Sequence, residues 1–217
     1  MTRNFLEIFA LVPKDGAVLT SEVREELREI LTILKRGPGS IVMEIRKDVA
    51  DPNALVCIAG WESLADHDDL DIQGIVPRVL KKLLKHFITG KPSFMYIDVA
   101  TIGAAFDVLG IHVFNVKNAE KAAFQKEIDA RPGLVGSWHT VIPVPPLPKV
   151  MPTDPTELAI IEAQKAGAER NLRHFTPAIW VAFSTPETDT MVGEFRTTVD
   201  MLVEEVKTTK YQKFLSG

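Results

Sequence analysis

The sequence of 217 residues contains a single cysteine, Cys57, which excludes an internal disulfide and any metal cage built from cysteines. It has no uninterrupted run of about 18 apolar residues, and its first residues show neither the apolar core nor the cleavage site of a secretion signal. Basic residues form no long run and the formal net charge is -4, which argues against nucleic acid. We therefore expect a cytoplasmic protein without nucleic-acid or membrane partners.

Several catalytic signatures are also missing. No two histidines have the close spacing of a metal site, and neither HExxH nor HxH occurs. Residues 35–40 contain glycines but lack the lysine–serine pair of a phosphate-binding loop, and residues 101–110 lack the GxGxxG spacing. The sequence therefore predicts no metal and no nucleotide cofactor.

The residues that are present predict a packed α+β protein, since 46% are hydrophobic and 25% are charged. An apolar strand over residues 5–12 precedes a helix that begins at Ser21 and carries one apolar stripe. The stripe consists of Val23, Leu27, Ile30, Leu31 and Leu34. Strands over 40–47 and 54–61, a helix that begins near Ser63 and carries apolar residues from Ile75 to Phe87, and a strand over 93–100 complete the order βαββαβ, the ferredoxin-like unit.

The same order begins again in the second half. A strand over 108–116 and a helix that Asn118 starts are followed by Pro-Gly and a strand over 134–144, as in the first half. A proline-rich loop, a helix over 154–173, a strand over 178–185 and a helix with apolar residues from Met191 to Val206 follow. No convincing fourth strand follows, because residues 210–217 suit a strand, a short helix or a tail equally. We expect repeats at 1–102 and 103–217, with an insertion at about 145–177.

A set of features in residues 4–100 resembles the antibiotic biosynthesis monooxygenase domain of the dimeric α/β-barrel superfamily. The features are Pro38-Gly39, the Asp51-Pro52 turn, and Trp61-Glu62-Ser63 before a helix that contains His67. The resemblance implies that two four-stranded sheets form a barrel, here two tandem ferredoxin-like repeats within one chain. It also implies a gap for a small apolar ligand and oxygenation without metal or flavin. Residues 69–74 lack the histidine of haem-degrading relatives, so no haem is expected.

Glu7 and His112 are the first candidates for acid–base chemistry. The first strands of the two halves overlay so that Glu7 pairs with His112 and Phe9 with Phe114. Alternation puts each polar residue on the face of its aromatic neighbour. If these faces line the interior, the two residues form a pair in which burial raises the carboxyl pKa and lowers the imidazole pKa. The alternatives are a solvent-exposed face and a structural ion pair.

Four further residues each allow two interpretations. Trp61 either fills the wedge between strand and helix, with its N–H on a carbonyl, or lines a cavity. His67 is either a surface histidine among acidic residues or a proton donor or acceptor at the cavity mouth. His139 is either a core histidine bonded to backbone or a catalytic group, and Trp138 lies on the opposite face of its strand. His86 and His174 are expected to be ordinary helix-end residues.

The leading hypothesis is an enzyme that acts on an apolar aromatic or polyketide-like molecule by oxygenation, cyclisation, dehydration or decarboxylation. The expected catalytic residues are His112, Glu7, His139 and His67, and the expected substrate contacts are Trp61, Phe9, Phe114 and Trp138. The alternative is a stress-associated or other barrel that binds a small ligand without converting it. A homodimer is left open, and the insertion is either a lid or a cover for an edge or interface.

Overall fold

The computed structural model describes residues 4–14, 19–51, 53–89, 93–97, 108–140, 145–173 and 178–216. The first half contains β1 (Asn4–Pro13), α1 (Ser21–Lys35), β2 (Ser40–Asp48), β3 (Leu55–Trp61), α2 (Leu64–Ile72), α3 (Ile75–His86), β4 (Phe87–Thr89) and β5 (Ser93–Ile97). The second half contains β6 (Val108–Val116), α4 (Lys121–Asp129), β7 (Val135–Trp138), α5 (Pro155–Arg173), β8 (Ala178–Ser184), α6 (Asp189–Val199) and β9 (Val203–Ser216). Both predicted repeats are therefore present.

The sequence signals of the first half predict the starts and the buried faces of its helices to within a residue or two. The predicted apolar stripe of α1 is buried along its whole length, which favours the helix by roughly 1.5–3 kcal/mol for each fully buried large side chain. The cap is Thr20 and not Ser21, because Thr20 Oγ1 accepts a hydrogen bond from the Val23 N–H at 3.3 Å. Ser63 caps α2 through the Asp66 N–H as expected. The single helix expected up to Phe87 is two helices, because Gly74 adopts a left-handed φ of 68° between them.

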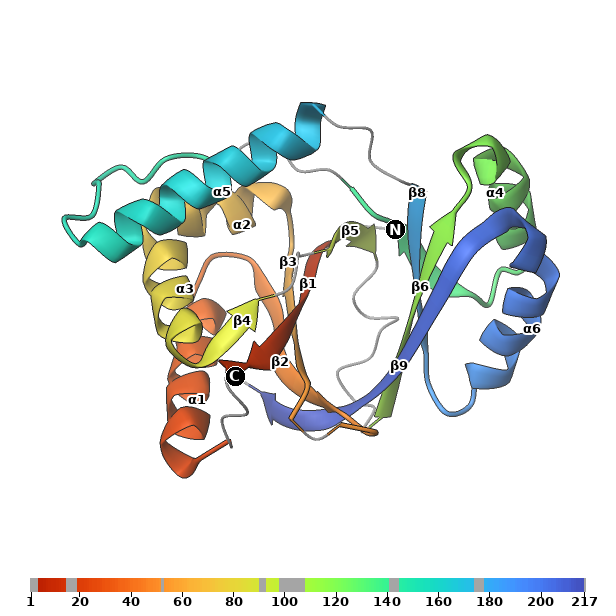
Figure 1. The fold of residues 1–217 in the computed structure, drawn as a ribbon, viewed down its shortest axis with the longest axis horizontal. Helices are drawn as coiled ribbons and strands as arrows, with labels where there is room; N and C mark the ends of the chain where they lie inside the picture. The colour runs from red at the N-terminus through yellow and green to blue at the C-terminus, as the bar shows by residue number, and fades with distance from the viewer. Residues whose placement is uncertain are drawn as a thin grey trace.

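The strands form one sheet that closes into a barrel. Their order is β4-β1-β3-β2-β9-β6-β8-β7, with β5 also paired to β1. The ends meet where the Thr140 N–H donates to the Phe94 carbonyl at 2.6 Å and Ser137 Oγ donates to the Tyr96 carbonyl at 2.8 Å. Helices flank the barrel on two opposite sides (Figure 1). The α+β prediction of an intramolecular α/β barrel from two ferredoxin-like repeats is thus confirmed.

The fourth strand of the second half exists, and the sequence-based doubt about it was wrong. β9 spans 14 residues and pairs with β6 on one side and β2 on the other, so it joins the two halves. Only Val203 and Leu215 of this strand are buried. Its many charged and threonine residues give no apolar alternation, so the sequence pattern could not reveal it.

Three apolar cores form layers. The barrel interior is packed by buried residues of both halves: Leu6, Ile8, Val56, Ile58, Met95, Ile97, Leu109, Ile111, Val181 and Phe183. A second core lies between the first-half strands and α1, α2 and α3. A third core lies between the second-half strands and α4 and α6, and contains Phe114, Phe124, Trp180 and Phe195. Polar residues on the outward strand faces therefore point toward helices.

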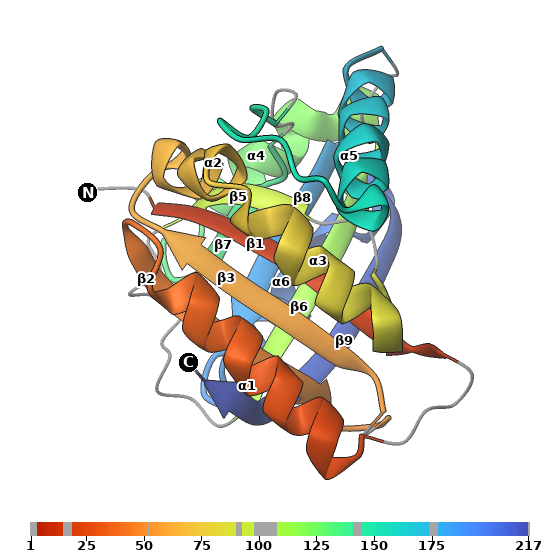
Figure 2. The same cartoon turned by 90° about the vertical axis from the view of Figure 1, so that its left-hand side faces the viewer.

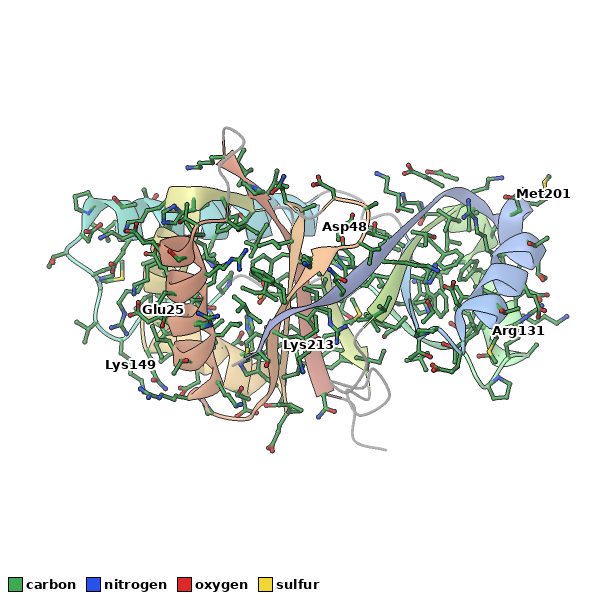
Figure 3. The ribbon with its side chains drawn as sticks, turned by 90° about the horizontal axis from the view of Figure 1, so that it is seen from below. Glu25, Asp48, Arg131, Lys149, Met201 and Lys213 are labelled. Carbon is green, nitrogen blue, oxygen red and sulfur yellow. The ribbon has the colours of Figure 1, made fainter. Side chains whose placement is uncertain are left out.

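The insertion of the second repeat docks on the helices of the first half. Figure 2 shows α5 beside α3, with the loop before it reaching α2. The Lys149 N–H donates to the Ile72 carbonyl at 2.8 Å, and Lys81 on α3 pairs with Asp154 and Glu157. Lys149 accordingly lies at the same end of the molecule as Glu25, opposite Arg131 (Figure 3). None of the described helices has the length and apolarity that a membrane span requires.

Candidate active site

The expected pair of Glu7 and His112 does not form. On β1, Leu6 and Ile8 fill the barrel interior, so Glu7 faces outward toward α2. On β6, Leu109 and Ile111 fill the interior, so His112 faces the second helix layer. The prediction was wrong because both strands turn their aliphatic faces inward, which leaves the mixed polar–aromatic faces to the helices.

The polar pair inside the barrel comes instead from a single strand. Glu44 and Arg46 alternate with Met43 and Ile45, which pack in the first outer core, so the charged side chains face the interior. Glu44 Oε1 lies 2.7 Å from Arg46 Nε, and the two residues are 3% and 0% exposed. Because each charge is paired, the two can be buried together at a tolerable cost.

Glu7 meets His67 in the first half. Glu7 comes from the middle of β1, and His67 lies one turn into α2, where the Ser63 cap fixes the start of the helix. Glu7 Oε2 lies 3.8 Å from His67 Nε2, and Asp68 Oδ1 lies 3.2 Å from His67 Nδ1. Asp71, one further turn along α2, completes a cluster in which three carboxylates surround one imidazole.

Aromatic rings enclose the imidazole of His67. Its centroid lies 4.8 Å from the Trp61 ring and 5.1 Å from the Phe5 ring, both in edge-to-face geometry, and 6.1 Å from the Phe94 ring. Tyr96 continues this wall against Phe5 at 5.5 Å. His67 is 6% exposed, so the rings remove it from water.

The protonation of the cluster follows from its charges. Burial by itself would lower the pKa of His67, but hydrogen bonds to Asp68 and Glu7 and the charges of Glu7 and Asp71 raise this pKa to about 9. Burial raises the pKa of Asp71 to about 7, with Glu7 and Asp68 adding to the shift and His67 opposing it. At neutral pH the site thus holds an imidazolium and a carboxyl group that is half protonated.

Trp61 fills the corner between β3 and α2 as expected and is 1% exposed. The expected carbonyl partner is missing: among the described residues, no acceptor bonds its buried Nε1–H. Ser40, which pairs with Trp61 across β2 and β3, also has a buried Oγ without a partner in the described chain. A buried N–H without an acceptor costs about 1–3 kcal/mol, which an oxygen atom of a ligand or water would recover.

His112 belongs to a complete hydrogen-bond network in the second half. Its Nε2 lies 2.8 Å from Ser184 Oγ, and its Nδ1 lies 3.1 Å from Thr208 Oγ1. Ser184 Oγ donates to Asp189 Oδ1 at 3.0 Å, and Lys210 Nζ donates to Asp189 Oδ2 at 2.5 Å. Burial lowers the pKa of His112; the charge of Asp189 opposes the shift, and Lys210 and Arg196 add to it. A neutral His112 therefore fits this network.

The other predicted residues lie away from His67 or in the packed core. His139 is half-buried, and its Nδ1 accepts the Phe94 N–H at 3.3 Å, so it is bonded to backbone but is not a core residue. Trp138 packs on Phe124 at 5.6 Å and donates to Gln125 Oε1 at 2.6 Å. Phe114 is buried in the second-half core, and Phe9 packs on the first-half core. His86 bonds Glu26 at 2.7 Å, and His174 lies outside the described residues.

Asp71 is the principal site residue that the sequence did not single out. It is 4% exposed and borders a small hollow that has room for about one water molecule. The lining consists of Asp71, Pro77, Pro145, Pro146, Leu147, Pro148, Ile161, Gln164 and Lys165. The proline-rich loop and α5, which belong to the second half of the chain, therefore cover Asp71 of the first half. Its position four residues after His67 was the available signal, but one aspartate among the four in residues 66–71 carries little information.

Comparisons with known proteins agree with this architecture. No protein-family model matches the sequence, and no curated protein matches it. A candidate monooxygenase from Lactobacillus acidophilus is 12% identical with a TM-score of 0.56, covering 100% of this chain and 96% of that chain. One from Fusobacterium nucleatum is 8% identical with a TM-score of 0.61, covering 99% and 94%. An anthrone oxidase-like protein is 14% identical with a TM-score of 0.58, covering 100% and 93%.

These values show a shared fold. Because the neighbours are covered almost end to end, they share the whole single-chain arrangement and not one repeat alone. The chain is thus an α/β-barrel protein of the kind first suggested by its N-terminal half. Its chemistry has to be argued from its own side chains.

Proposed function

We propose that this protein is an enzyme that transforms a small apolar aromatic molecule by acid–base chemistry at Glu7 and His67. The observation that carries the proposal is a half-buried carboxylate, Glu7, next to a buried imidazolium, His67, which the rings of Phe5, Trp61 and Phe94 surround. Aromatic walls suit an aromatic substrate, while the two charged groups supply the proton transfer. The monooxygenase and anthrone oxidase names of the structural neighbours favour oxygenation among such reactions.

In this proposal Glu7 removes a proton from a phenol or an activated carbon of the substrate. The His67 imidazolium and the free Trp61 N–H stabilise the oxyanion that develops, since both lie in a site from which water is largely excluded. The resulting electron-rich anion reacts with dioxygen. For an anthrone, a methylene group and one O₂ become a carbonyl group and one water molecule, so atoms and electrons balance.

A substrate reaches this site only if the cover moves. The hollow beside Asp71 holds little more than a water molecule, and the loop of residues 145–150 closes it. We assign the insertion the role of a lid over the first-half site, supported by its docking on α2 and α3. Such closure keeps water from the reacting anion.

The test measures oxygen uptake and quinone formation with an anthrone as the probe, in buffer that contains EDTA. Glu7→Gln should lower kcat by about 10²- to 10⁴-fold, the usual contribution of a general base. Glu62→Gln, which neutralises an exposed carboxylate near the same corner, should leave the rate unchanged. Equal rates for wild type and Glu7→Gln, with both proteins folded, would refute the assignment of Glu7.

A second candidate function is retention of a small molecule without conversion, which the close packing around His67 favours. Native mass spectrometry of freshly purified protein distinguishes the two. A bound aromatic compound that stays unchanged after exposure to oxygen supports the binder. A compound that gains oxygen, or loses hydrogen, supports the enzyme.

A further inference from the structure

We propose that His67, Asp68 and Asp71 bind a divalent first-row transition-metal ion. Each residue offers one ligand atom, and the three atoms lie within 4.8 Å of one another. Ligands about 2.1 Å from one ion are at most about 4.2 Å apart, so binding requires only a small closing movement. The three residues lie on α2 in the first and second turns, and Ser63 fixes the start of that helix.

Asp71 supplies an independent reason for an ion. Its carboxyl group is on a residue that is 4% exposed, and no residue in the described chain donates a hydrogen bond to it. A buried carboxylate without donors is costly to maintain. Among the described residues, His67 is the cation whose charge acts on the Asp71 pKa, and Asp68 and Glu7 also contact His67. A bound cation would give Asp71 the partner that the protein does not provide.

Metal binding displaces one proton from the His67 imidazolium to solvent, and the two ring nitrogens then have the arrangement of a metal-binding histidine. Nδ1 faces Asp68, a member of the ligand group, while Nε2 faces Glu7 at 3.8 Å. Metal-bound histidines usually direct the second ring nitrogen toward a carboxylate, which fixes the ring and its tautomer. Glu7 is therefore a positioning residue for the metal site.

The hollow beside Asp71 gives the ion a route and a further ligand. It has room for about one water molecule and lies between Asp71 and the loop that contains Pro145 and Pro148. Three protein ligands and one water complete a four-coordinate site. One imidazole and two carboxylates suit Zn²⁺, Mn²⁺ or Fe²⁺ better than Mg²⁺, which prefers oxygen ligands and retains its water.

The experiment is calorimetric titration of the untagged full-length protein, stripped with EDTA and dialysed, with Zn²⁺, Mn²⁺ and Mg²⁺. One saturable site is expected, with Zn²⁺ tighter than Mn²⁺ and Mg²⁺ weakest. Asp71→Asn should weaken Zn²⁺ binding at least about 100-fold, and Glu7→Gln about 10-fold. Asp69→Asn is the matched control, because Asp69 has the same charge on the same helix but bonds the exposed Gln73 side chain.

The results separate a site from general electrostatics. Loss of binding in Asp71→Asn with retention in Asp69→Asn supports the proposal. Equal losses in both, or no saturable Zn²⁺ binding in wild type, overturn it. If Asp71→Asn melts early, His67→Gln takes its place with the same expected loss. The titration needs no turnover and the anthrone assay contains EDTA, so failure of either proposal leaves the other standing.

Discussion

The two halves of the barrel carry opposite chemical groups at one equivalent strand position. Glu7 on β1 is paired with Ala59 and His112 on β6 with Ala182, so the two side chains occupy equivalent places. The first half meets its strand carboxylate with a helix histidine, His67; the second half meets its strand histidine with a helix carboxylate, Asp189. The carboxylate is on the strand and the histidine on the helix in the first half, and the reverse holds in the second half.

The side chains two residues before Glu7 and His112, and those paired with them, differ in size between the halves. The first half pairs Phe5 with Trp61, and the second half pairs Gly110 with Ser184 at the same register. Small residues let the second half bring hydroxyl groups to both nitrogens of His112. The first half has large aromatic residues at this position, and the buried Trp61 N–H has no acceptor among the described residues. The polar atoms around His112 thus bond one another, whereas the Trp61 N–H of the first half is available for an oxygen atom of a ligand.

The largest expected effect is on turnover. His67→Gln should lower kcat/KM for the anthrone probe by about 10²- to 10⁴-fold, because it removes the charge that stabilises the oxyanion. The kcat/KM of His112→Gln for the same probe should stay within about threefold of the wild-type value. Steady-state oxygen uptake of the two variants at equal folded concentration measures the difference. A greater loss in His112→Gln would reverse the assignment of the two halves.

The next effect is on stability and concerns the close packing of the second half. A Cβ at Gly110 would collide with Ser184 Oγ and lie 3.0 Å from His112 Nε2. Gly110→Ala should therefore lower the free energy of unfolding by about 1–3 kcal/mol. Gly193→Ala is the control, since a Cβ at this position on α6 meets nothing within 4 Å, and helix propensity predicts a gain of about 0.5–1 kcal/mol. Urea unfolding that shows no difference between the variants would argue against the packed network.

A smaller effect with opposite signs in the two halves is expected as pH changes in EDTA. The pKa of His67 is about 9 in the folded state against 6.5 ordinarily, so its stabilisation is full below pH 6.5 and is lost as pH rises to 9. The pKa of His112 is lowered, so the folded state loses stability as pH falls below 6.5. Melting temperatures measured across pH should fall less on the alkaline side in His67→Gln and less on the acidic side in His112→Gln than in wild type. The pKa of Asp71 is raised to about 7, so the folded state also loses stability as pH rises from about 4 to 7. Asp71→Asn should remove this loss.

The smallest effect tests the cover that the insertion forms over the first half. Lys81 is 35% exposed and Asp154 38%, so water screens their ion pair and its contribution to stability is small. Lys81→Gln should leave the melting temperature almost unchanged but increase protease cleavage within residues 145–154. Lys85→Gln, which loses an ion pair with Glu26 on α1 and not with the insertion, is the control and should be cleaved at the wild-type rate. Equal cleavage in all three proteins would show that this pair does not hold the insertion.

The sequence by itself determined the βαββαβ order of the first half and its repetition as far as α6. It also determined the buried stripe of α1, the cap at Ser63 and the start of α5 at Asp154, because these depend on residues within a few positions of one another. It also identified His67 and Trp61 as residues of interest. It did not show β9, because a strand that owes its place to partners on both sides needs little apolar alternation of its own.

Tertiary structure alone decided which partners the candidate residues meet. Alternation along β1 and β6 defines two faces but not which face closes on the barrel, and aliphatic packing from both halves settled that choice. Glu7 therefore found His67 and not His112. Burial of Asp71 likewise depends on a loop more than 70 positions away in the chain, which no local pattern contains. Contacts between distant segments set the protonation and the unsatisfied bonds of the site, and through them its chemistry.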